Sequence, residues 1–216
     1  MFKTRTASVG ILALLIACWI TVSTASAAGP YWRVSGAKLE QGVKQIKLQS
    51  KGPVIFTSSS VNLEIECRNS ISEGAAIEGN GTGQGQDKGR FTFTQCRAVK
   101  PTTCTSPATI TTVQTKSILL KEKEAQTGVE DQFEPTQGET FFTLALTNCG
   151  TLTGKHTVIG VMAGEVIPKP GIEQQEGLLL VNREVGGLRF DNMTGKLSAV
   201  FGTRLATNEP FGVSEI

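Results

Sequence analysis

The chain has 216 residues and a formal net charge of +2, from 21 Lys and Arg against 19 Asp and Glu. A balance this close to zero argues against a nucleic-acid-binding protein that depends on an overall basic surface. Hydrophobic residues make up 39% of the chain, enough to bury a core, whereas 24 Gly, 8 Pro and 19% charged residues are untypical of a helical bundle. A single histidine leaves little scope for metal or general-base sites.

Residues 1–27 have the features of a secretory signal peptide. Two basic residues near the start precede an apolar run from Val9 to Val22, and Ala25-Ser26-Ala27 follows as a small-residue cleavage site. The run is shorter than the roughly 20 apolar residues of a comfortable membrane span. We therefore expect a secreted chain that begins at Ala28.

A second interpretation of the same segment is a lipoprotein signal. Leu15-Ile16-Ala17-Cys18 resembles a lipobox, in which Cys18 would be lipidated and would anchor the chain on the outer face of the membrane. Against this, the apolar run continues past Cys18, where a lipobox normally closes it. Removing residues 1–27 takes away two positive charges and no negative one, so the exported chain is formally neutral. Attraction to nucleic acid, anionic lipid or an acidic polymer would then need a local patch of charge.

Apolar and polar residues alternate with a period of two through most of the remaining chain. The clearest examples are Val61 to Cys67 and Phe91 to Thr94, and abundant Thr suits a pleated surface. The expected strands are residues 43–48, 54–57, 61–67, 91–94, 117–120, 140–146, 157–166, 178–181, 197–201 and 211–216. Short helical turns are expected within residues 39–46 and 172–180.

Turn-forming Gly, Pro and Asn residues separate these runs at intervals typical of antiparallel sheets. The sequence predicts an all-β fold, an antiparallel β-sandwich with jelly-roll or Ig-like packing, formed by a single domain over residues 28–216. The tract Gly79–Gly89 is expected to be a mobile hairpin connection. A strand rather than a helix follows it, which argues against a phosphate-binding loop, and its single Asp argues against a calcium repeat.

The exported part holds four cysteines, Cys67, Cys96, Cys104 and Cys149, and an even number in an oxidising compartment predicts two disulfides. The favoured pairing joins Cys96 to Cys104 and Cys67 to Cys149, and the alternative joins Cys67 to Cys96 and Cys104 to Cys149. No Cys-x2-Cys spacing occurs and His156 stands alone, so no metal site is expected. With every thiol paired, a Cys–His nucleophile is not expected either.

Two pairs of residues are candidates for a function, and each has a plainer structural interpretation. Glu64 and Glu66 lie on one face of a strand, about 7 Å apart, whereas a glycoside hydrolase places its carboxylates on opposite sides of a bond. A solvated sheet face also explains them. Tyr31 and Trp32 could contact a ligand by stacking on a sugar ring, but a Trp in a first strand is more often a core anchor. No Gly-x-Ser-x-Gly element occurs, so no catalytic residue and no cofactor are expected.

Several segments carry a resemblance to known proteins. They are Trp32-Arg33-Val34-Ser35-Gly36, Leu63-Glu64-Ile65-Glu66-Cys67, Phe91-Thr92-Phe93-Thr94-Gln95-Cys96, Cys104 and residues 142–149. Their order resembles a group of secreted, disulfide-containing, β-rich proteins of high-GC Gram-positive soil bacteria, over residues 28–165. The resemblance implies export and the cysteine framework. The group has no assigned activity, so the resemblance implies no substrate.

The sequence therefore predicts a secreted, non-catalytic extracytoplasmic module with a structural or binding role, in which long loops make the contacts. The first alternative is a carbohydrate-binding module of the cell wall or matrix that uses Tyr31 and Trp32. The second is a secreted hydrolase that depends on Glu64 and Glu66. The expected partner is an extracellular glycan or protein; neither a nucleic acid nor a membrane span is expected.

Overall fold

The structure is a computed structural model that describes residues 29–81, 83–121, 128–182 and 187–215. The expected signal peptide, and with it the alternative lipidation site at Cys18, lies outside these residues. Within them, the structure holds no helix with the length and apolar character that crossing a membrane requires.

The described residues form an all-β fold in which two short 3-10 turns accompany the strands. The strands are β1 (Tyr31–Val34), β2 (Ala37–Lys38), β3 (Gln41–Ser50), β4 (Val54–Ser58), β5 (Leu63–Asn80), β6 (Gly85–Lys100), β7 (Thr109–Thr111), β8 (Thr115–Lys121), β9 (Val129–Pro135), β10 (Thr140–Leu146), β11 (Gly154–Ile159), β12 (Met162–Ile167), β13 (Gly177–Val181), β14 (Arg189–Phe190), β15 (Met193–Thr194), β16 (Lys196–Leu205) and β17 (Phe211–Ser214). The turns are η1 (Ser59–Val61) and η2 (Gly150–Leu152).

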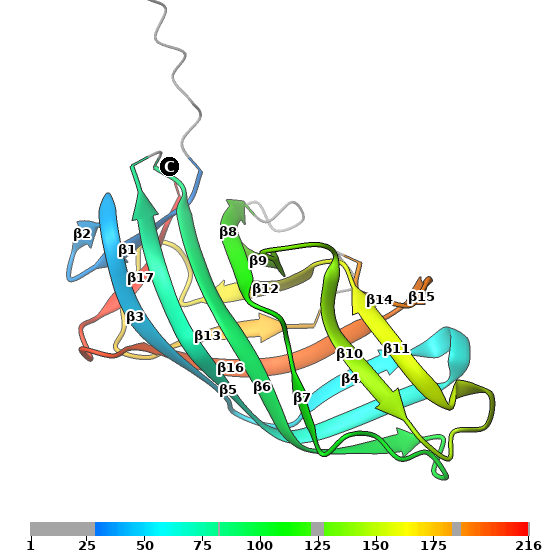
Figure 1. Cartoon of the computed structure of the whole chain (residues 1–216). Helices are drawn as coiled ribbons and strands as arrows, with labels where there is room; N and C mark the ends of the chain where they lie inside the picture. Colours follow the sequence, from blue (N-terminus) through cyan, green and yellow to red (C-terminus); the bar gives the residue numbers. More distant parts are fainter. Residues whose placement is uncertain (1–28, 82, 122–127, 183–186, 216) are drawn as a thin grey trace, which may run out of the picture.

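Most of the strands belong to one large antiparallel sheet that closes on itself. Its order is β3-β5-β4-β16-β13-β12-β9-β8-β6-β7, and the additional pairings β5 with β6 and β3 with β16 complete the ring of hydrogen bonds. Strands β3, β5 and β6 lie in front of β13 and β16 in Figure 1, and the core lies between these layers. The expected fold class, antiparallel β layers packed face to face with two disulfides, is confirmed.

Strands β5 and β6 are the longest because each pairs with two other strands along its length. The first half of β5 pairs with β4 and the second half with β3. Within the second half the β5–β6 register shifts near Gly74, whose φ of +61° is a left-handed conformation that costs glycine little. The expected hairpin connection is confirmed, although β5 ends at Asn80 and β6 begins at Gly85, both inside the Gly-rich tract.

Aromatic side chains fill the space between the layers. The ring centroid of Phe91 lies 5.5 Å from that of Phe133 and 5.6 Å from that of Phe201. Phe93, predicted to share a face with Phe91, is also buried and contacts Phe142. A three-stranded sheet, β17-β1-β2, lies at one end of the molecule, and a four-stranded sheet, β10-β11-β14-β15, lies at the other (Figure 1).

The favoured disulfide pairing is wrong, and the alternative pairing is the one the structure contains. Cys67 on β5 lies directly opposite Cys96 on β6 in the ladder, with 3.9 Å between the Cα atoms. Cys104 lies next to Cys149, where Thr105 and Thr147 form an isolated β-bridge. The prediction failed because it treated Cys67 as a partner for a distant strand, whereas hairpin register brings it to Cys96.

Three local expectations are also corrected. Residues 157–166, expected as one strand, divide at Gly160 into β11 and β12, which belong to different sheets; the φ of Gly160 is +107°. Residues 39–46 are not a helical turn, because most of them belong to β3, where Ile46 and Leu48 alternate inward. Residues 172–180 hold no helical turn either; the segment leads into β13.

Candidate functional site

Glu64 and Glu66 lie side by side on the outer face of β5, and each pairs with a cation on β6. The Glu64 carboxylate is 2.9 Å from Lys100 Nζ, and the Glu66 carboxylate is 3.4 Å from Arg97 Nη2. Both pairs are cross-strand neighbours on a solvated surface, where such pairs contribute little to stability. The two carboxylates do not face each other across a bond-sized gap, as hydrolysis by a carboxylate pair would require.

Trp32 is a core residue. Its exposed fraction is 3%, its indole Nε1 donates a hydrogen bond to the Gln86 carbonyl at 3.0 Å, and its ring packs near Phe211. The neighbouring Tyr31 ring is covered by Lys38, whose Nζ lies 4.8 Å from the ring centroid. All described Phe and Trp side chains are buried. Trp32 therefore lies in the core and presents no open ring face to a sugar, whereas Tyr31 is half-buried.

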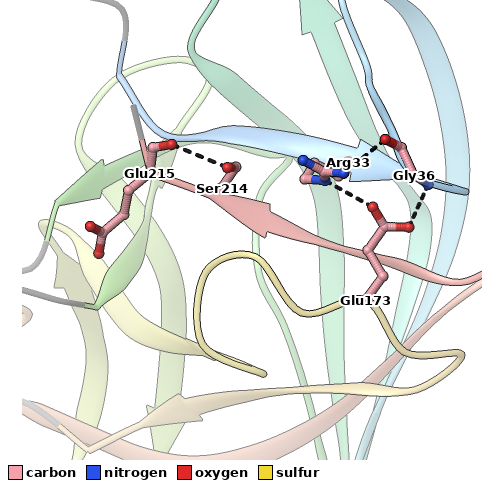
Figure 2. Close-up of polar contacts among 5 residues, drawn as sticks. All are labelled: Arg33, Gly36, Glu173, Ser214 and Glu215. Carbon is pink, nitrogen blue, oxygen red and sulfur yellow. Dashed lines mark hydrogen bonds and ion pairs between the residues drawn. The ribbon is translucent and has the colours of Figure 1, made fainter.

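A polar network beside Trp32 fastens the turn between β1 and β2 (Figure 2). Arg33 Nε donates to Glu173 Oε1 at 2.9 Å, the Gly36 amide donates to Glu173 Oε2 at 2.7 Å, and Arg33 Nη2 donates to the Gly36 carbonyl. The hydrogen bond that Arg33 donates to the Glu173 carboxylate raises the pKa of Arg33. The Arg33 guanidinium and the Glu173 carboxylate bind each other and the backbone of the turn, so the network has a structural role.

His156 is also held by contacts within the chain. Its Nδ1 lies 2.8 Å from Asp191 Oδ2, and its Nε2 lies 2.8 Å from the Leu152 carbonyl oxygen, so Nε2 is the donor in that contact. The ring stacks on Phe190 with 4.7 Å between centroids. Both ring nitrogens are occupied, so the imidazole joins β11 to η2 and to the β14–β15 turn.

A groove of about 380 Å³ lies on the outer face of β3, β5 and β16. Strand alternation builds it: Lys47 and Gln49 of β3 point outward, opposite Arg204 and Gly202 of β16 in the register, and exposed Ile71 of β5 forms a side wall. These residues come from three segments that are far apart in the sequence. The closed sheet alone brings them together.

The ladder between β3 and β5 opens beneath this groove. Its register shifts between Gln45 and Gln49, and side-chain hydroxyls replace backbone carbonyls as acceptors there. The Leu48 amide donates to Ser72 Oγ at 3.0 Å, and the Ser70 amide donates to Ser50 Oγ at 2.8 Å. The inserted serines satisfy the backbone groups and leave the two strands spread apart where the groove lies.

Two like charges in the groove lie where they lower the stability of the sheet. Lys47 and Arg204 are direct cross-strand partners, an arrangement of like charges that destabilises a sheet. Among the described residues, neither side chain takes part in an ion pair. Their positive charge is therefore available to a ligand.

The floor of the groove is Gly202, and an ion pair lies over it. A Cβ at Gly202 would collide with the Lys51 side chain and would lie 2.8 Å from Glu176 Oε1. Lys51 and Glu176 form an ion pair across this glycine. Lys51 and Arg204 hold the pKa of Glu176 below its ordinary value. With one carboxylate against three cations, the groove carries a net positive charge.

Two other hollows differ from the groove in their charge. A hollow of about 340 Å³ over β6, β8 and β9 contains Lys88 and Lys116, but Glu78 and Glu134 neutralise them. A hollow of about 500 Å³ adjoins the groove at Lys51 and is lined mainly by apolar residues. Of these three surfaces, the groove alone offers unpaired charge.

A pair of buried carboxyl groups lies in the core behind the groove. Asp87 of β6 and Asp131 of β9 hydrogen-bond to each other, and Ser117 Oγ donates to Asp87 Oδ1. Burial raises the pKa of Asp87 to about 6; burial and the neighbouring Asp87 charge raise the pKa of Asp131 well above its ordinary value. Both residues line a cavity of about 20 Å³ together with Leu48 and Thr203.

The residues of the groove and of the acid pair were not identified as a site from the sequence. Alternation around Leu48 placed Lys47 on the wet face of a strand, but that pattern does not say which strand lies beside it. Asp131 lies in β9, a segment not expected as a strand because polar residues dominate it. The chain as a whole matches no family model, no curated protein and no solved structure.

Proposed function

We propose that the chain is a non-catalytic extracytoplasmic binding module whose groove over β3 and β16 binds an acidic polysaccharide. The observation that carries the proposal is the opposition of Lys47 and Arg204 without an ion-pair partner among the described residues. Placing two cations side by side costs stability, and an anionic ligand between them would offset that cost.

The extracytoplasmic location is supported by the disulfides Cys67–Cys96 and Cys104–Cys149. Such bonds persist in oxidising compartments and are rare in reducing ones. The signal-peptide features of residues 1–27 point to the same route. A surface for binding polymers outside the cell agrees with both observations.

The class of ligand follows from the chemistry of the groove. Lys47 and Arg204 favour carboxylate or sulfate groups, and the exposed Gln49 amide between them and Lys51 can both donate to and accept from sugar hydroxyls. The groove is open on an outer sheet face, where a chain can lie along β16. A neutral glycan recognised by aromatic stacking is less well supported, because Trp32 and the described Phe residues are buried.

Binding to a defined polyanion tests the proposal. We expect the full chain to bind dextran sulfate and not neutral dextran. Lys47→Glu and Arg204→Glu should each weaken binding about tenfold or more, because each reverses a charge that the ligand contacts. The matched control is Lys155→Glu, an exposed lysine of β11 in the four-stranded sheet.

The control should bind as the unmodified chain does. Equal binding by all four proteins, or an equal loss in Lys155→Glu, would show that the groove is not the binding site. Release of reducing ends from the polymer would contradict the non-catalytic part of the proposal.

A further inference from the structure

We infer, on the basis of the proposed function, that the buried pair of Asp87 and Asp131 makes binding in the groove pH-dependent, with tighter binding of an anionic ligand under acidic conditions. The pair would thus regulate the site that lies behind it, without touching the ligand.

The groove and the cavity of the acid pair lie on opposite faces of the same two strands, β3 and β16. On β3, Ile46 and Leu48 point inward and line the cavity, while Lys47 points outward into the groove. On β16, Thr203 lines the cavity and Arg204 lines the groove. A single layer of backbone and side chains therefore separates the buried carboxyl groups from the ligand-binding cations.

Among the described residues, no basic group lines the cavity of the acid pair. On its other side Asp87 borders the hollow over β6, β8 and β9, where Lys88 and Lys116 are paired with Glu78 and Glu134. The charged groups that act on the acid pair are both acidic: Glu78 from β5 acts on Asp87, and Glu130 acts on Asp131, its neighbour on β9. Ser117 of β8 contributes a hydroxyl. The lining side chains contributed by β1, β3, β12, β13, β16 and β17 are apolar or, in one case, a hydroxyl.

The geometry of the pair indicates that it is neutral under acidic conditions. Both carboxyl groups line one cavity, with exposed fractions of 5% for Asp87 and 2% for Asp131, and burial favours the protonated form of each. The Asp131 Oδ1 atom has no hydrogen-bond partner among the described residues. The cavity that both residues line, of about 20 Å³, is large enough for one water molecule. A proton can therefore leave the pair only by adding a buried negative charge.

That added charge would act through the strand layer on the groove. Inside the protein the field of a charge is weakly screened, so an ionised pair attracts the cations of the groove inward and repels an anionic ligand. The coupling is reciprocal: a bound polyanion disfavours loss of the proton by the same free energy. A coupling of typical size corresponds to about a fivefold change in affinity.

The experiment measures the affinity of the full chain for dextran sulfate at about pH 5 and about pH 7.5, at one low ionic strength. Sulfate esters stay ionised over this range, so a change in affinity belongs to the protein. We expect binding about fivefold weaker at the higher pH. Asp87→Asn should reduce this ratio to less than about twofold, because it removes the buried carboxyl group that ionises in this range. Asp131→Asn leaves Asp87 buried and should keep a clear pH ratio.

A control variant replaces a polar side chain outside the ring of strands that carries the groove. His156→Asn lies in β11, in the four-stranded sheet, and should keep the ratio of about fivefold. The near-ultraviolet circular dichroism of each variant reports whether it is folded. If Asp87→Asn does not fold, Asp87→Ser takes its place, and the unmodified chain at the two pH values still decides whether binding depends on pH.

The outcomes also separate this regulation from the proposed function. Equal affinity of the unmodified chain at both pH values, with Lys47→Glu still weakening binding, overturns the regulation and leaves the binding site in place. A pH ratio that persists in Asp87→Asn also overturns it. If Lys47→Glu and Arg204→Glu bind normally, the site itself is wrong, and any pH dependence has another origin.

Discussion

Asp87 is buried because its strand must alternate. Gln86 and Lys88 of β6 face outward, so the residue between them faces the core, where Ser117 and Asp131 are its polar neighbours. Removing a carboxylate from water favours its neutral form, and this raises the pKa of Asp87 from 3.8 to about 6. The folded state therefore holds a proton that the unfolded chain releases at lower pH.

This raised pKa predicts a fall in stability between acidic and neutral pH. The stabilisation from the Asp87 proton is fully present below the unfolded pKa of 3.8 and is lost as the pH rises through about 6. The loss is about 3 kcal/mol for a shift of this size. Asp87→Asn keeps the shape and the acceptor for Ser117 but does not ionise. Urea unfolding at several pH values should show the unmodified chain losing stability relative to this variant.

Asp191→Asn is the control, because its linkage has the opposite sign. Partial burial disfavours the Asp191 carboxylate, but hydrogen bonds from His156 and Thr157 outweigh it and lower the pKa. Its stabilisation is present above the unfolded pKa and is lost as the pH falls through the folded value. Between about pH 4 and pH 6, parallel stability curves for the unmodified chain and Asp87→Asn would contradict the prediction.

At the scale of single elements, local patterns predicted strands well but did not predict which strands are neighbours. The expected strand 140–146 coincides with β10, and residues 54–57 fall within β4, because both are short runs made only of apolar residues and Thr. Strand β9 escaped prediction because Asp131 occupies an inward position where the pattern requires an apolar residue. The single strand predicted over residues 157–166 is wrong at Gly160, where the chain leaves one sheet for another.

The candidate site was less predictable than the strands, for the same physical reason. Lys47 and Arg204 are 157 positions apart and meet only through the register of β3 and β16. Predicting the disulfides also requires the strand register, because the register of the β5–β6 hairpin places Cys67 opposite Cys96. Periodicity and composition are local properties of the sequence. The groove forms only when the sheet closes on itself and brings β3 beside β16.

The two disulfides should differ in what they hold in place. Cys67–Cys96 lies within a continuous ladder, whereas Cys104–Cys149 ties a loop to the end of β10 beside the Thr105–Thr147 bridge. Replacing either pair by alanine should lower the free energy of unfolding by about 2 to 4 kcal/mol. Only loss of Cys104–Cys149 should accelerate amide hydrogen exchange at the Thr105–Thr147 bridge, because few other contacts restrain that loop.

Exchange at Thr105 and Thr147 is therefore the discriminating measurement. The alanine variant of Cys67 and Cys96 is its matched control, since it removes the same number of bonds from another place. Equal protection of these two amides in both variants would mean that the β-bridge holds the loop without the disulfide.

A molecule with no net charge can still carry a positively charged site, because the fold places some of its cations away from carboxylates. Once residues 1–27 are set aside, positive and negative charges balance. Seven of the 17 described Lys and Arg side chains form an ion pair, as Lys100 does with Glu64. The groove is distinguished by two cations unpaired among the described residues, Lys47 and Arg204, that are direct cross-strand partners. Attraction to a polyanion thus depends on where cations lie close together and not on the net charge.

This arrangement predicts a specific dependence of binding on salt. Each cation that neutralises a charge on a linear polyanion releases counterions, so the logarithm of affinity falls linearly with the logarithm of salt concentration. With two unpaired cations, raising salt from about 50 to about 500 mM should weaken dextran sulfate binding about thirtyfold. Lys47→Gln leaves one such cation and should reduce the change to about fivefold, whereas Lys155→Gln should leave the slope unchanged. A slope that Lys47→Gln does not alter would mean that the polyanion is held by cations elsewhere, because a neutral residue at position 47 cannot release a counterion.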